Sequence, residues 1–257
     1  MTIKNVIIVL HGGLGNQLFQ FFRGLLILIE HPRYKIFFQE YFLDKYPVSR
    51  EYSLSPITKA LYFCHRIKKV NFFIRMRFLV KIINKILRKD LIISIWPCYI
   101  IVDGYFQNAL NYKDINKDAI KGAIDLLRKI TQEKLLINKP IKKEIHHIRL
   151  TDFFVSEEKS RKFIQDFLNC CNGNINVITD DEDLFFDIVK NTKLSFRVNV
   201  IPTKNSSSWD LLHILSSYRV VNTNGSSLAF WGALLSGGVL ITSNKEHQEL
   251  FTFINET

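Results

Sequence analysis

The chain has 257 residues, of which 47% are hydrophobic, and a formal net charge of +11. This length and apolar content allow one large or two small domains with a buried core, and they exclude a disordered or low-complexity chain. The sequence contains no apolar run long enough for a transmembrane helix or a secretory signal, and its four cysteines form no Cys-x-x-Cys pair, so we expect a cytoplasmic protein with reduced thiols.

The first half of the chain mixes clear and unclear patterns. Residues 5–10 are short, apolar and β-branched, which predicts a buried parallel strand. A glycine-rich turn at residues 11–16 leads into helical spacing over residues 17–30. Residues 41–65 show no clear pattern. Strands are further predicted at 34–39, 91–95 and 99–102, and helices at 66–89 and 114–131.

The second half alternates regularly between strands and helices. Strands are predicted at 143–149, 175–179, 196–201, 218–223 and 238–242, and helices at 157–171, 181–191, 208–217 and 226–236. Such alternation is typical of βαβ units. We therefore predict an α/β protein with two Rossmann-like domains, residues 1–137 and 138–257, whose parallel sheets face a cleft and bind ligands at the carboxyl ends of their strands.

The first motif is the turn at residues 11–16. Glycines let the backbone turn sharply and approach a ligand, and the helix that follows offers N–H groups and a positive dipole end. Gly13 and Gly15 fit part of a dinucleotide fingerprint, but Leu18 replaces its third glycine. A purely structural turn and a phosphate-binding turn both fit. Asn16 and Gln17 place two amides where the helix begins.

The second motif follows the strand at 143–149. Alternation along a strand puts His147, Arg149 and Thr151 on one face, and Arg149 could bind a phosphate through two N–H groups. The adjacent histidines, His146 and His147, point to opposite faces, which argues against a shared metal. A surface ion pair between Arg149 and Asp152 is the structural alternative.

Two further motifs also follow strands. The acids at residues 180–183 could hold a divalent cation through Asp181 and Asp183, or they could cap and stabilise a helix start; Asp180, next to the strand end, is the better functional candidate. Residues 222–227 are small and polar and precede a helix, which fits a diphosphate cradle.

Together these segments resemble the bacterial alpha-1,2-fucosyltransferase family. The Gly-Gly-Leu-Gly-Asn-Gln-Leu-Phe-Gln turn of that family is present at residues 12–20, and similar segments follow in the same order at 103–107, 147–153, 179–181 and 225–233. Three positions depart from the pattern: Leu150 stands where the family has a second Arg, Thr151 where it has Gly, and Gly225 where it has Asn.

The resemblance implies a GT-B glycosyltransferase with an acceptor-side first domain and a nucleotide-sugar-binding second domain. It implies GDP-fucose as donor, the 2-hydroxyl of a galactoside in a surface glycan as acceptor, inversion at the anomeric carbon, and no metal or other cofactor. It implies that His147 and Asp180 or Asp181 hold the guanine and that Asn16 lies near the reacting sugar. The candidate catalytic residues are Arg149, Asn16 and Asp152, and the general base stays open between Asp152 and His11. The candidate donor-binding residues are Gly13, Gly15, His147, Thr151, Asp180, Asp181, Asn224, Ser226 and Ser227.

Other functions compete with this one. A dinucleotide-dependent oxidoreductase would need the missing third glycine, although Glu40 could serve as its ribose-binding acid. Two further alternatives stay open. One is a transferase with a different nucleotide sugar. The other is a non-catalytic nucleotide- or glycan-binding module that associates with membranes, because Leu150 stands where the family has a second Arg.

Most of the positive charge is local. Residues 66–90 hold nine Lys/Arg and one Asp, which is +8 of the +11. The predicted helix at 66–89 has one apolar and one basic stripe, so it fits either an ordinary domain helix or peripheral contact with an anionic membrane at its cytoplasmic face, where a lipid-linked acceptor would lie. No nucleic-acid-binding motif accompanies it. The apolar stripe is Phe72, Met76, Leu79, Ile83 and Ile86, and the basic stripe is Arg77, Lys81, Lys85 and Arg88.

Overall fold

The computed structural model describes residues 5–40, 43, 50–59, 64–67, 91–95, 99–135, 140–151, 154 and 156–257. The chain divides into two compact units, residues 1–136 with 249–257 and residues 137–248. Each unit is built on its own sheet of five strands, so the predicted α/β class with two Rossmann-like parts is confirmed. Residues 249–257 are predicted to belong to the second domain, but they group with the first unit.

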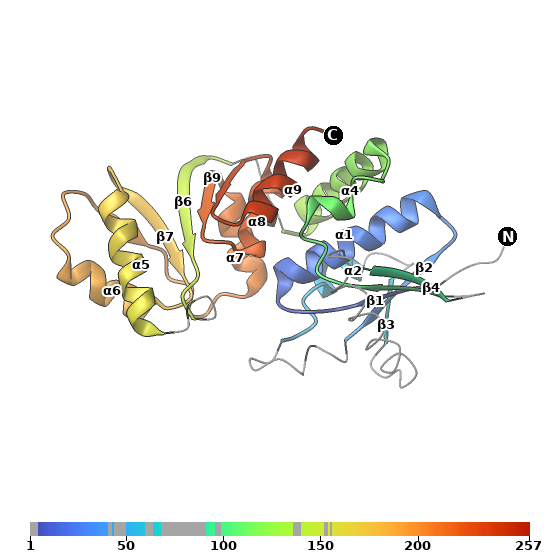
Figure 1. Cartoon of the computed structure of the whole chain (residues 1–257), viewed down its shortest axis with the longest axis horizontal. Coiled ribbons are helices and arrows are strands. Elements are labelled where there is room, and N and C mark those ends of the chain that lie inside the picture. Colours follow the sequence, from blue (N-terminus) through green and yellow to red (C-terminus); the bar gives the residue numbers. More distant parts are fainter. Residues whose placement is uncertain are drawn as a thin grey trace. The chain divides into compact units, whose positions relative to one another are not determined.

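The first unit has the strand order β3-β2-β1-β5-β4. The apolar strand β1 (Asn5–Val9) lies at its centre between β2 (Lys35–Gln39) and β5 (Tyr99–Asp103), and it is parallel to both. Helix α1 (Leu14–Glu30) packs on this sheet, and α4 (Lys117–Leu135) packs on α1 (Figure 1). The described part of the unit also contains two short helices, α2 (Ser55–Thr58) and η2 (Ala109–Asn111), and the residues of α9 (Lys245–Asn255) from 249 on.

Two predictions about this unit are wrong. Strand β4 (Leu91–Ile95) pairs antiparallel with β5, because the three residues between them are too few for the crossover that a parallel pair needs. Residues 66 and 67, predicted as helix, belong to β3 (Cys64–Ile67), which pairs parallel with β2 and so joins the edge of the sheet. The rest of the predicted basic helix, residues 68–89, lies outside the described residues.

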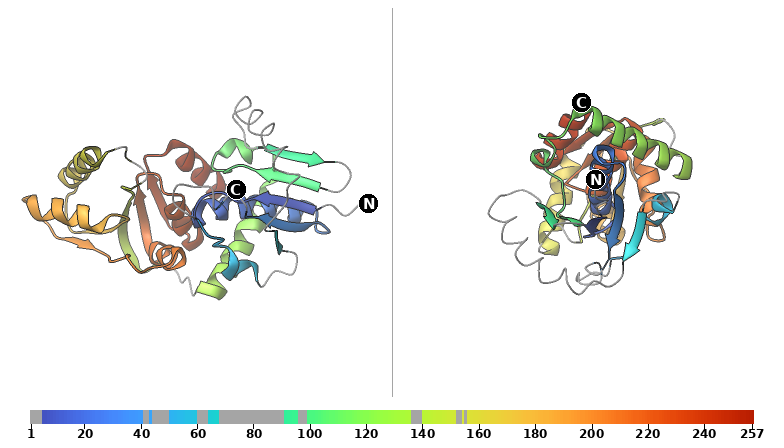
Figure 2. Two further views of the ribbon diagram at one scale, coloured as in Figure 1. Left: turned by 90° about the horizontal axis from the view of Figure 1, so that it is seen from below. Right: turned by 90° about the vertical axis from the view of Figure 1, so that its right-hand side faces the viewer.

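The second unit has the order β10-β9-β6-β7-β8, and every pair in it is parallel. Its first strand is therefore central, with the next two on one side and the last two on the other, which is the doubly wound arrangement. Helices α5 and α6 lie on one face of the sheet and α7 and α8 on the other (Figures 1 and 2). The strands are β6 (Lys142–Ile148), β7 (Ile175–Thr179), β8 (Val198–Val200), β9 (Tyr218–Thr223) and β10 (Val239–Thr242), and the helices are α5 (Glu157–Cys170), α6 (Glu182–Asn191), α7 (Ser208–Ser216) and α8 (Ser227–Ser236). Helix α9 (Lys245–Asn255) begins in this unit and ends in the first.

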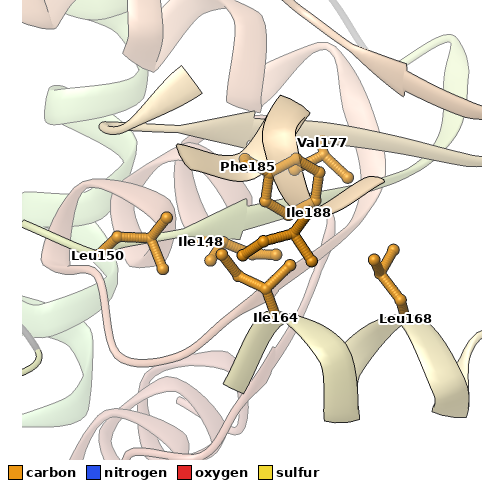
Figure 3. Packing of buried hydrophobic residues seen from close by; sticks show 7 residues of the cluster. All are labelled: Ile148, Leu150, Ile164, Leu168, Val177, Phe185 and Ile188. Carbon is orange, nitrogen blue, oxygen red and sulfur yellow. The ribbon is translucent and has the colours of Figure 1, made fainter. Parts of the chain in front are cut away.

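One face of the second sheet is closed by a compact apolar cluster. Ile164 from α5, and Phe185 and Ile188 from α6, pack against Ile148 of β6, and all four are almost fully buried (Figure 3). Leu150 belongs to the same cluster and is only 2% exposed. The Leu150 side chain is therefore part of the core of this unit.

No helix in the described part of the chain is long and apolar enough to cross a membrane.

Candidate functional site

The second sheet reverses its strand order between β6 and β9. Ligands of open α/β sheets bind outside the carboxyl ends of the strands at such a reversal. Arg149 follows β6 and Asn224 follows β9, and the two meet here. The Asn224 Oδ1 accepts a hydrogen bond from the Arg149 N–H at 3.0 Å, and its Nδ2 donates to the Arg149 carbonyl at 2.8 Å. Asn224 therefore fixes the main chain from which the Arg149 guanidinium extends.

Helix α8 begins beside this clamp. The Thr223 hydroxyl accepts hydrogen bonds from the N–H groups of Gly225 and Ser226, and the Ser226 hydroxyl accepts from the Ala229 N–H. Gly225 has φ 122°, a conformation that L side chains rarely adopt, so glycine is needed in this turn. The first turn of α8 contains no acidic side chain, whereas those of α5, α6 and α7 do. The positive end of the α8 dipole thus lacks a carboxylate from its own first turn.

Asp180, directly after β7, holds the loop that follows β6. Its Oδ1 accepts from the N–H groups of Leu150 at 2.6 Å and Thr151 at 3.4 Å, and its Oδ2 accepts from the Thr151 hydroxyl at 2.7 Å. Both carboxylate oxygens are thus engaged by the loop. This arrangement makes Asp180 a positioning residue for the segment that carries Arg149.

The acids after Asp180 have separate structural roles. Asp181 caps α6, accepting from the Leu184 N–H at 3.0 Å, and Glu182 accepts from both the N–H and the hydroxyl of Thr203. No group of three His, Cys, Asp or Glu side chains in the described ranges could hold a metal ion. The helix-start alternative of the sequence analysis is therefore observed: Asp181 is the cap of α6, and Glu182 and Asp183 lie in its first turn.

His147 is a buried polar side chain with an unsatisfied atom. It is 6% exposed, and its Nδ1 has no hydrogen-bond partner among the described residues. Burial, followed by the positive charge of Arg149, lowers the pKa of His147 from 6.5 to about 4, against the opposing effect of Asp180. The imidazole is therefore neutral at neutral pH. It lines a pocket of about 360 Å³ at the ends of β6 and β7, whose other walls include Thr179, Asp180, Asp181, Glu182, Asp183, Thr203, Lys204 and Leu211.

In the first unit, two glutamines of the segment 12–20 form hydrogen bonds to neighbouring loops. Gln17 donates to the carbonyls of Gly12 and Glu51 and accepts from the Ser53 N–H. Gln20 accepts from the His11 N–H and donates to the Gly104 carbonyl, joining the turns after β1 and β5. Both side chains are 0% exposed, so the fold itself accounts for these two amides.

The glycines of this motif differ in what they permit. Gly12 has φ +68°, and a Cβ built there would overlap the side chain of Asn16. Gly13, the residue before α1, has φ −78°, and a Cβ there would meet no described atom closer than the Arg50 Nη1 at 4.0 Å. Gly12 is thus required by the fold, whereas Gly13 leaves space beside the helix start. Asn16 is half-buried and accepts from the Gln107 Nε2 at 2.7 Å.

An imidazole–carboxylate pair lies at the same edge of the first sheet. The His11 Nε2 is 2.6 Å from the Asp103 Oδ1, and both side chains are buried. Tyr105 lies beside the imidazole, with 5.6 Å between ring centroids, and is 40% exposed.

The predicted site residues thus fall into two groups. At the strand ends of the second unit the structure gathers His147, Arg149, Thr151, Asp180, Asp181, Asn224, Ser226 and Ser227. At the helix start after β1 it gathers Gly13, Gly15 and Asn16. Asp152 lies outside the described residues. The sequence analysis did not single out Thr203 or Lys204, although the rule that sites follow strand ends would have found them after β8.

Comparison with known proteins finds similarity only among solved structures; no family model and no curated protein matches the chain. The chain is similar to the Bradyrhizobium fucosyltransferase NodZ, an alpha-1,6-fucosyltransferase also crystallised with GDP, at 12% identity over 91% of this chain and 93% of that one, with a TM-score of 0.43. It is similar to the E. coli heptosyltransferase WaaC with ADP at 14% identity over 98% and 97%, with a TM-score of 0.40. A family 9 glycosyl transferase from Veillonella parvula is similar at 9% identity over 98% and 89%, with a TM-score of 0.38. At such values, function has to be argued from the residues of the site.

Proposed function

We propose that this protein is an inverting glycosyltransferase whose second unit binds a nucleotide sugar and whose first unit binds the acceptor. In its most specific form, the proposal is transfer of L-fucose from GDP-fucose to the 2-hydroxyl of a galactoside in a surface glycan. The observation that carries it is the clamp of Asn224 on the main chain of Arg149, beside a helix start with no acid in its first turn.

The clamp supports this function through the charge that develops in the reaction. As the bond between the sugar and the β-phosphate breaks, negative charge grows on the nucleotide diphosphate, which is the leaving group. A guanidinium on a fixed main chain and the N–H groups of a helix start can stabilise that charge without reorganising, which is the most effective form of electrostatic catalysis. We therefore propose that Arg149, Ser226 and Ser227 bind the diphosphate and that no metal is required.

The pocket beside His147 supports a nucleobase at the other end of the donor. Its volume of about 360 Å³ lies within the range typical of small-molecule sites. A hydrogen bond from a ligand could satisfy the His147 Nδ1, and a carboxylate in the wall could pair with the two N–H donors on the edge of guanine. The loop engages both oxygens of Asp180, whereas Asp181 caps α6 through its Oδ1, so we propose Asp181 for this pairing.

Calorimetric titration with GDP-fucose and other nucleotide sugars tests the donor class, and release of GDP in the presence of glycan acceptors tests transfer. Arg149→Ala should lower transfer by about 2–4 kcal/mol of transition-state stabilisation, and Arg149→Lys should also fail because a point charge does not reproduce the two-pronged contact. Arg219→Ala, which removes an exposed Arg of β9, is the matched control. Normal turnover by Arg149→Ala would refute the assignment, and donor binding without any transfer would favour a non-catalytic binding module.

Metal independence has its own test. Transfer should survive EDTA. Abolition by EDTA with rescue by Mn²⁺ would instead make Asp181 and Asp183 metal ligands.

We further propose that residues 68–89 bring the enzyme to an anionic membrane that carries a lipid-linked acceptor. These residues lie outside the described ranges, so the support is their sequence pattern of apolar and basic stripes. The wild-type protein should float with anionic vesicles at low salt and dissociate from them at high salt. The triple variant Arg77/Lys81/Lys85→Glu should not float at either salt concentration. If the wild-type protein does not float either, the membrane proposal is wrong.

A further inference from the structure

The pocket beside His147 contains a second carboxylate that the proposed function leaves unassigned. Glu182 is the first residue of α6, is half-buried, and lines this pocket. Its Oε1 accepts hydrogen bonds from the Thr203 N–H at 2.5 Å and from the Thr203 hydroxyl at 2.9 Å. Its Oε2 accepts no hydrogen bond from the described part of the chain. One oxygen of this carboxylate therefore binds the protein, and the other is open to a ligand.

Thr203 fixes the orientation of this carboxylate. It lies in the loop after β8, and its hydroxyl is also within 3.2 Å of the Thr179 carbonyl oxygen at the end of β7. Because the N–H and the hydroxyl of Thr203 both reach the same oxygen, the carboxylate cannot turn without losing two hydrogen bonds. Glu182 is therefore oriented before a ligand binds, which lowers the free-energy cost of binding one.

The place of Glu182 in the sheet indicates which part of a nucleotide would meet it. The sheet reverses between β6 and β9, and β7 lies next to β6 on the other side, so β7 is the second strand of this unit. In doubly wound sheets that bind nucleotides, the phosphates lie at the loop after the first strand, and an acid after the second strand binds the ribose. Among the acids after β7, the loop engages both oxygens of Asp180, and Asp181 caps α6. Glu182 comes next, with one oxygen fixed and the other open.

We propose that Glu182 binds the ribose of the nucleotide sugar and that Thr203 is its positioning residue. A carboxylate oxygen has two lone pairs and no hydrogen to donate, so the Oε2 can accept from the neighbouring 2′- and 3′-hydroxyls together. With the base beside His147 and the ribose at Glu182, the pocket of about 360 Å³ holds the nucleoside end of the donor. The site therefore selects ribonucleotides against 2′-deoxyribonucleotides. This inference rests on the proposed function, because it requires a nucleotide in this pocket.

Calorimetric dissociation constants for GDP and 2′-deoxy-GDP test this assignment without any transfer. The wild type should bind GDP about 10–100-fold more tightly, which is the usual contribution of a hydrogen bond to a charged group. Glu182→Gln keeps an oxygen for Thr203 and should fold normally. Its NH₂ group replaces the acceptor, so the preference for GDP should fall by about 5–10-fold.

Two further variants complete the comparison. Thr203→Val removes one of the two hydrogen bonds that orient the carboxylate, so it should lower the preference for GDP to a smaller extent. Asp166→Asn removes a carboxylate charge from an exposed position of α5 and should keep the wild-type preference. If another nucleoside diphosphate binds in place of GDP, its 2′-deoxy form replaces 2′-deoxy-GDP in the same comparison.

The ribose site and the proposed function fail by different results. If the wild type binds GDP and 2′-deoxy-GDP equally, the ribose assignment is wrong while the proposed function stands. If Glu182→Gln weakens both nucleotides to the same extent and keeps the wild-type preference, Glu182 only supports the pocket and the assignment fails. A full preference in Thr203→Val would remove the positioning role of Thr203. If the wild type binds none of GDP, ADP, UDP and CDP, the proposed function fails, and the ribose site falls with it.

Discussion

The buried imidazole of His147 should make the stability of this protein depend on pH below neutrality. Its folded-state pKa of about 4 lies below the ordinary value of 6.5. Between these two values the unfolded chain binds a proton that the folded chain does not, so the free energy of unfolding falls as the pH falls through this window. Above about pH 6.5 both states are neutral at this position, and the effect vanishes.

The size of the effect follows from the two pKa values. The full difference, from 6.5 to about 4, corresponds to about 3 kcal/mol, since one pKa unit is worth 1.36 kcal/mol. About 2 kcal/mol of this should already be lost at about pH 5. His147 is buried, so solvent screening reduces these values little. Burial also lowers the pKa of His247 to about 4, and this second histidine adds a loss over the same window.

Urea unfolding at neutral pH and near pH 5 measures this dependence, and substitution separates the two histidines. In His147→Gln the loss of stability on acidification should be smaller than in the wild type by about 2 kcal/mol. His213→Gln removes an exposed imidazole of α7 and serves as the control. Two of the three tryptophans, Trp209 and Trp231, belong to the same unit as His147, so fluorescence follows its unfolding. An identical pH dependence in the wild type and His147→Gln would refute the buried neutral state.

Three further substitutions test the site by thermal or chemical unfolding and by turnover. Asp180→Ala should cost about 1–2 kcal/mol, because the N–H of Leu150 loses its acceptor, and an unchanged stability would contradict its role in holding the loop. Gly12→Ala should be less stable than the wild type, because of the positive φ at this position and the contact with Asn16. Gly13→Ala should be as stable as the wild type, but it should lose turnover if a ligand occupies the space beside Gly13. Equal stability of the two variants would contradict this difference. Leu150→Arg should lower the free energy of unfolding by at least about 3 kcal/mol, because it places a charge in the core. Leu150→Met is the control and should be tolerated. A stable Arg variant would mean that the side chain at this position can leave the core.

Periodicity predicted the second unit well because each of its elements has a regular pattern. Strands 175–179 and 218–223 match β7 and β9 to the residue. Helix α9 was not predicted, although Asn244 caps it through the His247 N–H and Leu250, Phe251 and Ile254 supply its buried face. A cap followed by helically spaced apolar residues could have identified it.

Sheet topology was less predictable, because it depends on connections and not on periodicity. Residues 91–95 and 99–103 have the composition of buried strands whichever way they run, and only the short link between them makes the pair antiparallel. The segment 64–67 contains His65 and Arg66 and has no strand periodicity of its own. Its strand state comes from pairing with β2, a tertiary contact that the local sequence does not encode.

The positions of the site motifs were predictable, but the roles of their residues were not. A strand end before a helix start can be recognised in a sequence, and the structure gathers polar residues at those ends. An amide or a carboxylate, however, can bind either a ligand or the protein's own backbone. Gln17, Gln20, Asp180 and Asn224 all bind backbone groups, which no spacing rule distinguishes from ligand binding.

Hydrogen-bond satisfaction gives a physical criterion for one half of this distinction, because it identifies the polar side chains that folding alone explains. A buried polar atom costs free energy unless it is bonded, so a buried side chain bonded to the backbone is explained by folding alone. Gln17 and Gln20 meet this condition. His147 does not: its Nδ1 is buried without a partner in the described chain, and the ring lines a pocket. A ligand that forms a hydrogen bond with this atom would remove the cost of its burial. His147 is therefore the residue whose contact with a bound nucleotide would most directly link this pocket to function.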